Sequence, residues 1–188
     1  MRASQILTKK KYNVFGYDKN KNNFISNLKD KGVLISHDLS TKNITNKILD
    51  VKKTLVVHTP AIKQNHALYL FFRDHNFTII KRAQLLSEIA SNYNVIAIAG
   101  THGKTTTSTI LSHLLFENNI SFTSFVGGIS ENYNSNLIEN GEDIVLVEAD
   151  EFDRSFLTLY PNIACITSID SDHLDIYDSG KELEESFK

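Results

Sequence analysis

Seven consecutive residues, Gly100-Thr101-His102-Gly103-Lys104-Thr105-Thr106, are of the types that bind nucleotide phosphates. Glycines let backbone N–H groups turn towards an anion, and the start of a following helix adds the positive end of its dipole. The ammonium of Lys104 is long enough to reach the outer phosphates, and the Thr105 hydroxyl is of the type that binds the bridging Mg²⁺. The loop therefore predicts a site for ATP and Mg²⁺.

The match to the general phosphate-loop pattern G-x-x-x-x-G-K-[ST] is incomplete. That pattern places its first glycine at position 98, where this chain has Ile98, and Gly100 serves instead. Gly-Lys-Thr after an apolar strand is also consistent with an ordinary turn and helix start. The apolar strand, the two glycines, the lysine and the three threonines together favour the phosphate loop.

Two acidic clusters follow later apolar runs, at Glu148-Ala149-Asp150-Glu151 and at Asp170-Ser171-Asp172-His173-Leu174-Asp175. The carboxyl ends of parallel strands meet at the ligand-binding edge of an open sheet, and carboxylate oxygens suit Mg²⁺. Asp150 or Asp170 alone is equally consistent with a solvated turn residue, and His173 alone is more consistent with a residue that has no role in the site. Considered together, the clusters predict that Glu148 and His173 share a second metal ion, distinct from the one on Thr105.

The elements that must position these residues alternate between short apolar runs and helical patterns, which is typical of a mainly parallel sheet covered by helices. The predicted strands are Tyr12–Tyr17, Val33–Ser36, Thr54–His58, Phe77–Ile80, Val95–Ala99, Ser121–Val126, Ile144–Glu148 and Ile163–Thr167. The predicted helices are Asn22–Lys31, Asn65–His75, Ala83–Ser91 and Lys104–Glu117. The polar, Asn-rich stretch Glu131–Gly141 is predicted to be a loop. A polar break at Ser91–Asn94 divides the chain into domains 1–91 and 92–188.

The composition of the chain limits the binding partners and the cellular compartment that we expect for it. The chain has 188 residues, of which 41% are hydrophobic and 22% charged, and a net charge of -2 gives no reason to expect a nucleic-acid or membrane partner. Its single cysteine, Cys165, lies in an apolar run and is expected to be a buried strand thiol, which fits a reducing cytoplasm. No apolar stretch is long enough to span a bilayer, and no secretory signal is visible.

The two ends of the sequence suggest a fragment. Ala3, Ile6 and Leu7 have helical spacing and lead into a strand, although a helix that feeds a parallel strand normally follows an earlier strand. Residues Gly180–Lys188 have the pattern of a helix that has just begun. We therefore expect the folded domains to be truncated.

The motifs resemble those of the Mur ligases, in order and over essentially the whole chain. The resemblance lies in the ATP loop Gly100–Thr107, the acidic signature Glu148–Leu157, the segment Asp172–Tyr177, the loop His58–Ile62 with Asn65, and the segment Lys81–Leu86. It implies a Rossmann-like UDP-sugar domain without its first strand, followed by an incomplete P-loop-type ATPase domain with a parallel sheet. The chain departs from the family at Ser168, where many members have Asn, so we assign no role to that position.

The resemblance also implies a substrate site and a reaction. Thr59, Pro60 and Ala61 follow a predicted strand, where an open sheet binds ligands, and with Asn65 and Arg82 they are expected to contact UDP-N-acetylmuramate. ATP would phosphorylate the lactyl carboxylate of this substrate, and the amine of L-alanine would attack the acyl phosphate to form an amide. Lys104 and metal ions on Thr105, Glu148 and His173 would neutralise charge at the migrating phosphoryl group. We expect the 188-residue piece alone to bind nucleotide weakly at best and not to form the amide.

Other functions remain possible at this point. The murein-peptide recycling ligase shares the ATP loop but lacks the compact acidic form found at residues 148–156. Folylpolyglutamate synthase has Asn in place of His102 and Gly in place of Thr105. A nucleotide-binding P-loop module without ligase chemistry, such as a switch or a kinase, would leave the upstream domain unexplained.

Overall fold

The computed structural model describes residues 2–21, 23–38, 48, 50–149, 157–170 and 185. It divides into two compact units, Met1–Leu85 and Leu86–Lys188. This division falls inside helix α4 (Arg82–Ala90), whereas the sequence placed the break after Ser91. The assignment of a separate function to residues 1–91 and 92–188 stays a prediction.

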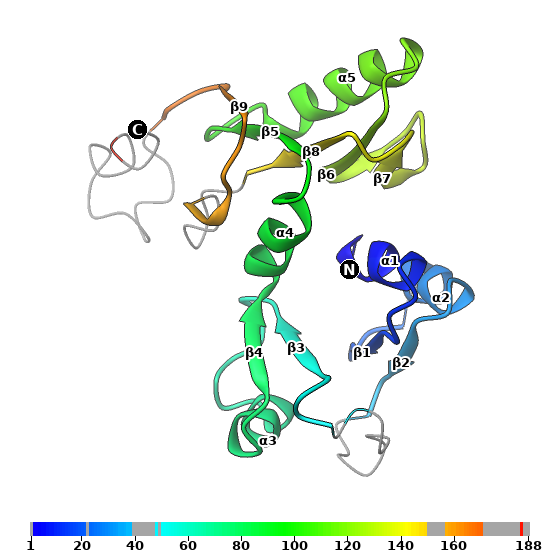
Figure 1. Cartoon of the computed structure of the whole chain (residues 1–188), viewed down its shortest axis with the longest axis vertical. Coiled ribbons are helices and arrows are strands. Elements are labelled where there is room, and N and C mark those ends of the chain that lie inside the picture. The colour runs from blue at the N-terminus through cyan, green and yellow to red at the C-terminus, as the bar shows by residue number, and fades with distance from the viewer. Residues whose placement is uncertain are drawn as a thin grey trace. The chain divides into compact units, whose positions relative to one another are not determined.

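The first unit alternates helices and short strands as expected (Figure 1). Its elements are α1 (Arg2–Lys9), β1 (Phe15–Tyr17), α2 (Asn23–Asp30), β2 (Leu34–Ser36), β3 (Leu55–His58), α3 (Ala67–Asp74) and β4 (Thr78–Lys81), and α4 follows β4 directly. β1 pairs with β2 and β3 pairs with β4, both in parallel. Among the described residues these strands form two separate pairs, where the sequence suggested a single sheet.

The second unit has a five-stranded sheet in the order β7-β6-β8-β5-β9 (Figure 1). Its elements are β5 (Asn94–Ala99), α5 (Lys104–Glu117), β6 (Phe122–Ser130), β7 (Ser135–Glu139), β8 (Ile144–Glu148) and β9 (Ile163–Ile166). Every neighbouring pair is parallel except β6 and β7. The α/β class and the parallel sheets are thus confirmed. β5 and β8 lie inside the sheet and are mostly buried, because both carry the continuous apolar sequence of strands covered on two faces.

Helix α5 packs closely against β6 through small polar side chains. Ser108 and Ser112 of the helix are fully buried, and Ser112 Oγ lies 2.7 Å from Ser124 Oγ on β6. The short serine side chains let the helix approach the sheet, while Ile110 and Leu114 on another face remain exposed. Across the described ranges, no helix is long and apolar enough to cross a membrane.

The loop predicted at Glu131–Gly141 is wrong, because this stretch contains strand β7. Ser135 pairs with Ser130 across a turn in which Asn134 adopts a positive φ of 46°, and β7 runs antiparallel to β6. Leu137 and Ile138 are buried, and Ile138 joins the core formed around β6. The sequence of this stretch has only two apolar residues among polar ones, so it lacks the alternating pattern that indicates a strand. The strand forms because it pairs with β6.

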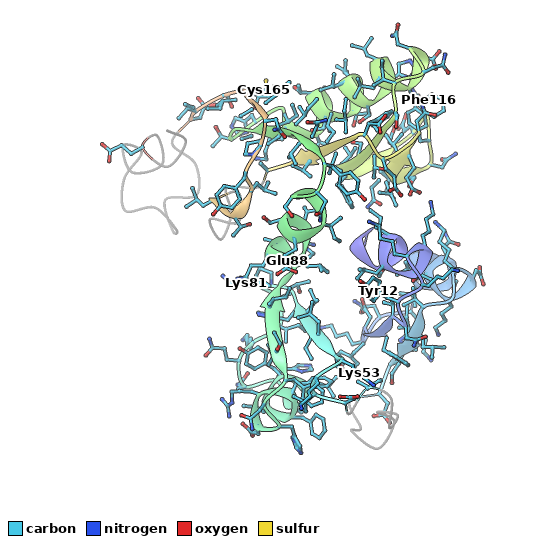
Figure 2. All side chains as sticks on the ribbon, viewed as in Figure 1. Tyr12, Lys53, Lys81, Glu88, Phe116 and Cys165 are labelled. Atoms are coloured by element: carbon cyan, nitrogen blue, oxygen red, sulfur yellow. The ribbon has the colours of Figure 1, made fainter. Side chains whose placement is uncertain are left out.

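The expected burial of Cys165 is also wrong. The thiol is exposed, as are the other residues of β9 (Figure 2). β9 pairs only with β5 among the described residues, so it lies at an edge of the sheet. An apolar run therefore predicted the strand correctly without showing whether the strand lies inside the sheet or at its edge.

Candidate nucleotide-binding site

The glycine loop joins the end of β5 to the start of α5, as the sequence predicts. Gly100 has a φ of 121° and Gly103 a φ of 81°, values that side-chain-bearing residues rarely adopt. Gly103 is the N-cap residue of α5, and its carbonyl accepts the Thr107 amide at 2.9 Å. The N-terminus of a 14-residue helix therefore opens directly onto the loop. This arrangement fits a phosphate group, because the helix amides and dipole favour an anion there.

Lys104 is the first residue of α5, and its side chain folds back over the loop. Its Nζ donates to Gly100 O at 2.5 Å and lies 3.3 Å from Thr101 O. The ammonium is therefore held beside the loop backbone. A cation at this position suits the outer phosphates of a nucleotide.

Thr105 and Glu148, the predicted metal ligands on α5 and β8, are in contact. Thr105 Oγ1 donates to Glu148 Oε1 at 2.8 Å. Glu148 pairs with Ile98 across the parallel strands β8 and β5, which brings its carboxylate beside the loop that follows β5. A hydroxyl and a carboxylate oxygen together form a donor set that fits Mg²⁺.

Gly127 also contacts this carboxylate, and sequence reasoning missed it. Its amide donates to Glu148 Oε2, and a Cβ at position 127 would collide with both carboxylate oxygens. A methyl at Gly128, by contrast, would lie 3.4 Å from Thr105 Cγ2. The Gly-Gly pair inside a strand was the available signal, since glycine in a strand often marks a close approach.

The segment Thr167–Asp170, which follows β9, is hydrogen-bonded to the glycine loop. The Ser168 hydroxyl accepts the His102 amide at 2.9 Å, and Thr167 Oγ1 lies 2.5 Å from His102 O. Asp170 N donates to Thr101 Oγ1 at 2.8 Å. Ser168, to which the sequence assigned no role, is therefore in direct contact with the loop.

The second predicted metal site is only partly described. His173, Asp150 and Asp172 lie outside the described residues, so the pairing of Glu148 with His173 stays a prediction. Asp170 is described, and its Oδ2 lies 3.9 Å from His102 Nε2. Within the described ranges, no group of three or more His, Cys, Asp or Glu side chains is placed to hold a metal ion.

In the first unit, the predicted substrate residues follow β3 and β4. Thr59 comes directly after β3 and Arg82 directly after β4, and the parallel pairing matches His58 with Lys81. Thr59 and Arg82 therefore lie at the same edge of this strand pair. The Thr59 carbonyl accepts the Ile62 amide at 3.0 Å, so the residues between them, Pro60 and Ala61, form a turn.

Asn65 does not start the next helix, contrary to the sequence prediction. α3 begins at Ala67, and its N-cap residue is His66. The His66 amide donates to Lys63 O at 3.0 Å, which closes a separate turn around Asn65. Asn65 remains a candidate substrate residue on this exposed turn.

Comparison with known families gives two matches that together cover almost the whole chain. Residues 2–94 match the model described as the Mur ligase family catalytic domain, and residues 98–188 match the Mur ligase middle domain. The UDP-N-acetylmuramate–L-alanine ligase of Flavobacterium psychrophilum is 49% identical over 176 residues, and that of Christiangramia forsetii is 47% identical over 176 residues. These alignments cover 94% and 93% of this chain but only 39% of each relative, so the chain spans well under half the length of these relatives.

Solved structures of similar fold come from two kinds of ligase. The UDP-N-acetylmuramate–alanine ligase of Thermotoga maritima has a TM-score of 0.85 at 26% identity, covering 99% of this chain and 43% of that one. A UDP-N-acetylmuramate:L-alanyl-γ-D-glutamyl-meso-diaminopimelate ligase from Neisseria meningitides has a TM-score of 0.84 at 21% identity, covering 100% of this chain and 62% of that one. The likeness to both structures shows that this chain shares their fold.

Proposed function

The chain belongs to the Mur ligase family, and we propose from this premise that it carries the ATP site and part of the UDP-sugar site of a cytoplasmic UDP-N-acetylmuramate–L-alanine ligase. Such an enzyme contributes to peptidoglycan precursor synthesis. The observation that carries the proposal is the contact of Thr105 with Glu148 beside a glycine loop at a helix N-terminus. The identities of 49% and 47% to alanine ligases support the choice of reaction.

The proposed ATP site comprises the loop Gly100–Thr106 and the start of α5. The loop's positive-φ glycines and the Lys104 ammonium fit a chain of phosphates. The sequence assigned Thr105 and Glu148 to two distinct metal ions, but because these side chains are in contact we propose that they hold one Mg²⁺, together with His173 from outside the described residues. When bound, this ion would neutralise charge on the phosphate oxygens.

The chain's own residues would act mainly by orientation and charge. The proposed reaction transfers the terminal phosphoryl group of ATP to the lactyl carboxylate, and the L-alanine nitrogen then displaces phosphate to give the amide. Lys104 would place a positive charge where negative charge builds up during phosphoryl transfer. Gly127 on β6 holds the Glu148 carboxylate by a hydrogen bond. The carboxylate would therefore need little reorganisation when Mg²⁺ and ATP bind.

The first unit would hold the UDP-N-acetylmuramate substrate. Thr59, Pro60, Ala61 and Arg82 lie at the carboxyl end of β3 and β4, which is the ligand-binding edge of a parallel sheet. Asn65 lies on the exposed turn that precedes α3. We propose that these five residues contribute to recognition of the sugar nucleotide.

Two measurements test the proposal. The purified chain should bind a non-hydrolysable ATP analogue more tightly with Mg²⁺ than with EDTA, and it should bind UDP-N-acetylmuramate. A chimeric ligase, in which this chain replaces the matching segment of the Flavobacterium psychrophilum enzyme, should add L-alanine to UDP-N-acetylmuramate. Failure of both the chain and the chimeric ligase to bind ATP or UDP-N-acetylmuramate would overturn the proposal.

A further inference from the structure

Thr101 and His102, which follow Gly100 in the loop, both donate their backbone amides to Ser168. Thr101 N donates to Ser168 O at 3.1 Å, and His102 N donates to Ser168 Oγ at 2.9 Å. A backbone amide has one hydrogen, so these two donors are committed to Ser168 in this structure. The sequence had assigned Thr101 and His102 to nucleotide binding together with the rest of the loop.

The side chain of Thr101 points the same way. It is 7% exposed, and its Oγ1 accepts the Asp170 amide at 2.8 Å. The same oxygen lies 3.2 Å from Ser168 Oγ. Thr101 and Ser168 therefore join the loop after β5 to the segment after β9 through both backbone and side-chain atoms.

Gly100 is required by this close approach. A Cβ at position 100 would lie 2.7 Å from Ser168 O and 2.8 Å from Ser168 N, which is closer than packed atoms allow. The first glycine of the loop thus stands where the segment after β9 crosses the loop. This explains why the glycine lies at position 100, although the general phosphate-loop pattern places it at position 98.

We propose that Ser168 is a positioning residue for nucleotide binding, an inference that rests on the proposed ATP site. Its hydroxyl and carbonyl hold the Thr101 and His102 amides, which fixes the shape of the loop before nucleotide arrives. The phosphates are then bound by the part of the loop that starts at Gly103 and enters α5. Thr101 and His102 support the loop from the β9 side.

The matched variants are Ser168→Ala, Ser168→Thr and Ser135→Ala in the 188-residue chain. Ser135 is the control because it is also half-buried and its Oγ accepts a backbone amide, that of Leu137, at 3.0 Å. It lies on β7, and two hydrogen bonds of its hydroxyl join it to the backbone of Leu137. Each variant is titrated with an ATP analogue and Mg²⁺, its thermal midpoint is measured, and exchange of the loop amides is followed by NMR.

Ser168→Ala should weaken binding of the ATP analogue roughly tenfold, because the His102 amide loses its acceptor and the loop loses its fixed shape. The His102 amide should exchange faster in this variant, whereas Ser168→Thr and Ser135→Ala should keep the wild-type affinity. Equal affinities of Ser168→Ala and wild type would overturn the inference and leave the proposed function standing. A loss in Ser168→Thr or Ser135→Ala as large as that in Ser168→Ala would also overturn it. Absence of nucleotide binding by both the wild-type chain and the chimeric ligase would overturn the proposed function itself.

Discussion

The Glu148 carboxylate accepts a hydrogen bond of 2.8 Å from the hydroxyl of Thr105, which lies 43 positions earlier in the chain. Its second oxygen accepts the amide of Gly127. The first turn of α5 therefore orients one carboxylate oxygen, and the strand β6 orients the other. The consequences of this arrangement are open to direct test.

Glu148→Gln should remove most of the Mg²⁺ enhancement of nucleotide binding. Glutamine keeps the size of the side chain, but it is neutral and replaces one ligand oxygen with an amide nitrogen. The measurement is the affinity of the chain for an ATP analogue, once with Mg²⁺ and once with EDTA. Glu139→Gln, which changes an exposed carboxylate on β7, is the control. An unchanged ratio of the two affinities in Glu148→Gln would show that this carboxylate does not hold the metal.

Lys104→Ala should lower turnover of the chimeric ligase by about 10²-fold or more, because a charge contact in the transition state is lost. Steady-state formation of UDP-N-acetylmuramoyl-L-alanine measures this effect. Lys53→Ala is the control, since Lys53 is an exposed lysine that pairs with Asp50 in the other unit. Retention of more than about a tenth of wild-type turnover by Lys104→Ala would contradict the assigned role.

Gly127→Ala and Gly128→Ala should differ sharply, although they are neighbours. The new methyl at position 127 would displace the Glu148 carboxylate, whereas the one at position 128 would lie at an ordinary contact distance of 3.4 Å from the Thr105 methyl. We expect Gly127→Ala to lose the Mg²⁺-dependent part of nucleotide binding and Gly128→Ala to keep most of it. Equal losses in both variants would mean that β6 tolerates no side chain at either position.

Ala61→Leu should raise the KM of the chimeric ligase for UDP-N-acetylmuramate without changing its KM for ATP. Ala61 is exposed on the turn after β3, so a larger side chain there would obstruct a ligand without disturbing a core. Initial rates with each substrate varied in turn separate the two KM values. A similar rise in both would indicate general damage to the fold.

The stability of the second unit should fall as the pH rises above about 10. Burial raises the pKa of Tyr133 above its ordinary value of 10.0, and the charge of Glu117 raises it further. The folded state therefore holds this proton more tightly, so the stabilisation is complete below pH 10 and is lost as the pH passes the folded-state pKa. Tyr133→Phe, which also removes the 2.9 Å contact with His113 Nδ1, should show a shallower fall in the thermal midpoint. Tyr160→Phe, which changes an exposed phenol, is the control, and a slope equal to that of wild type in Tyr133→Phe would contradict the assignment.

The sequence predicted best those elements whose signals are local. α5 has the predicted bounds Lys104–Glu117, because Gly103 marks its start and no breaker interrupts it. β8 likewise has the predicted bounds Ile144–Glu148, since an unbroken apolar run is typical of a strand inside a sheet. The rule that parallel strands place their carboxyl ends at one edge predicted that Thr105 and Glu148 lie at the same site. Their direct contact was not predicted, because the sequence assigned the two residues to distinct metal ions.

The features that the sequence did not show depend on contacts between distant segments. β7 forms because β6 offers it a hydrogen-bonding edge, and the sequence of β7 alone does not reveal that partner. The contacts of Ser168 join residues 66 positions apart, and the exposure of Cys165 depends on which strand has a neighbour on only one side. Residue types and spacing contain little information about such pairings.

The position of β8 between β5 and β6 has a consequence for the order of folding. β5 and β6 come earlier in the chain, yet they do not pair with each other, because β8 occupies the place between them. A refolding chain can pack α5 against β6 and form the β6–β7 hairpin from nearby residues. The Glu148 carboxylate reaches Thr105 only after β8 has inserted, a step that requires closure of a longer loop and is therefore slower. We therefore expect the nucleotide site to be completed late in folding, after the local structure around it has formed.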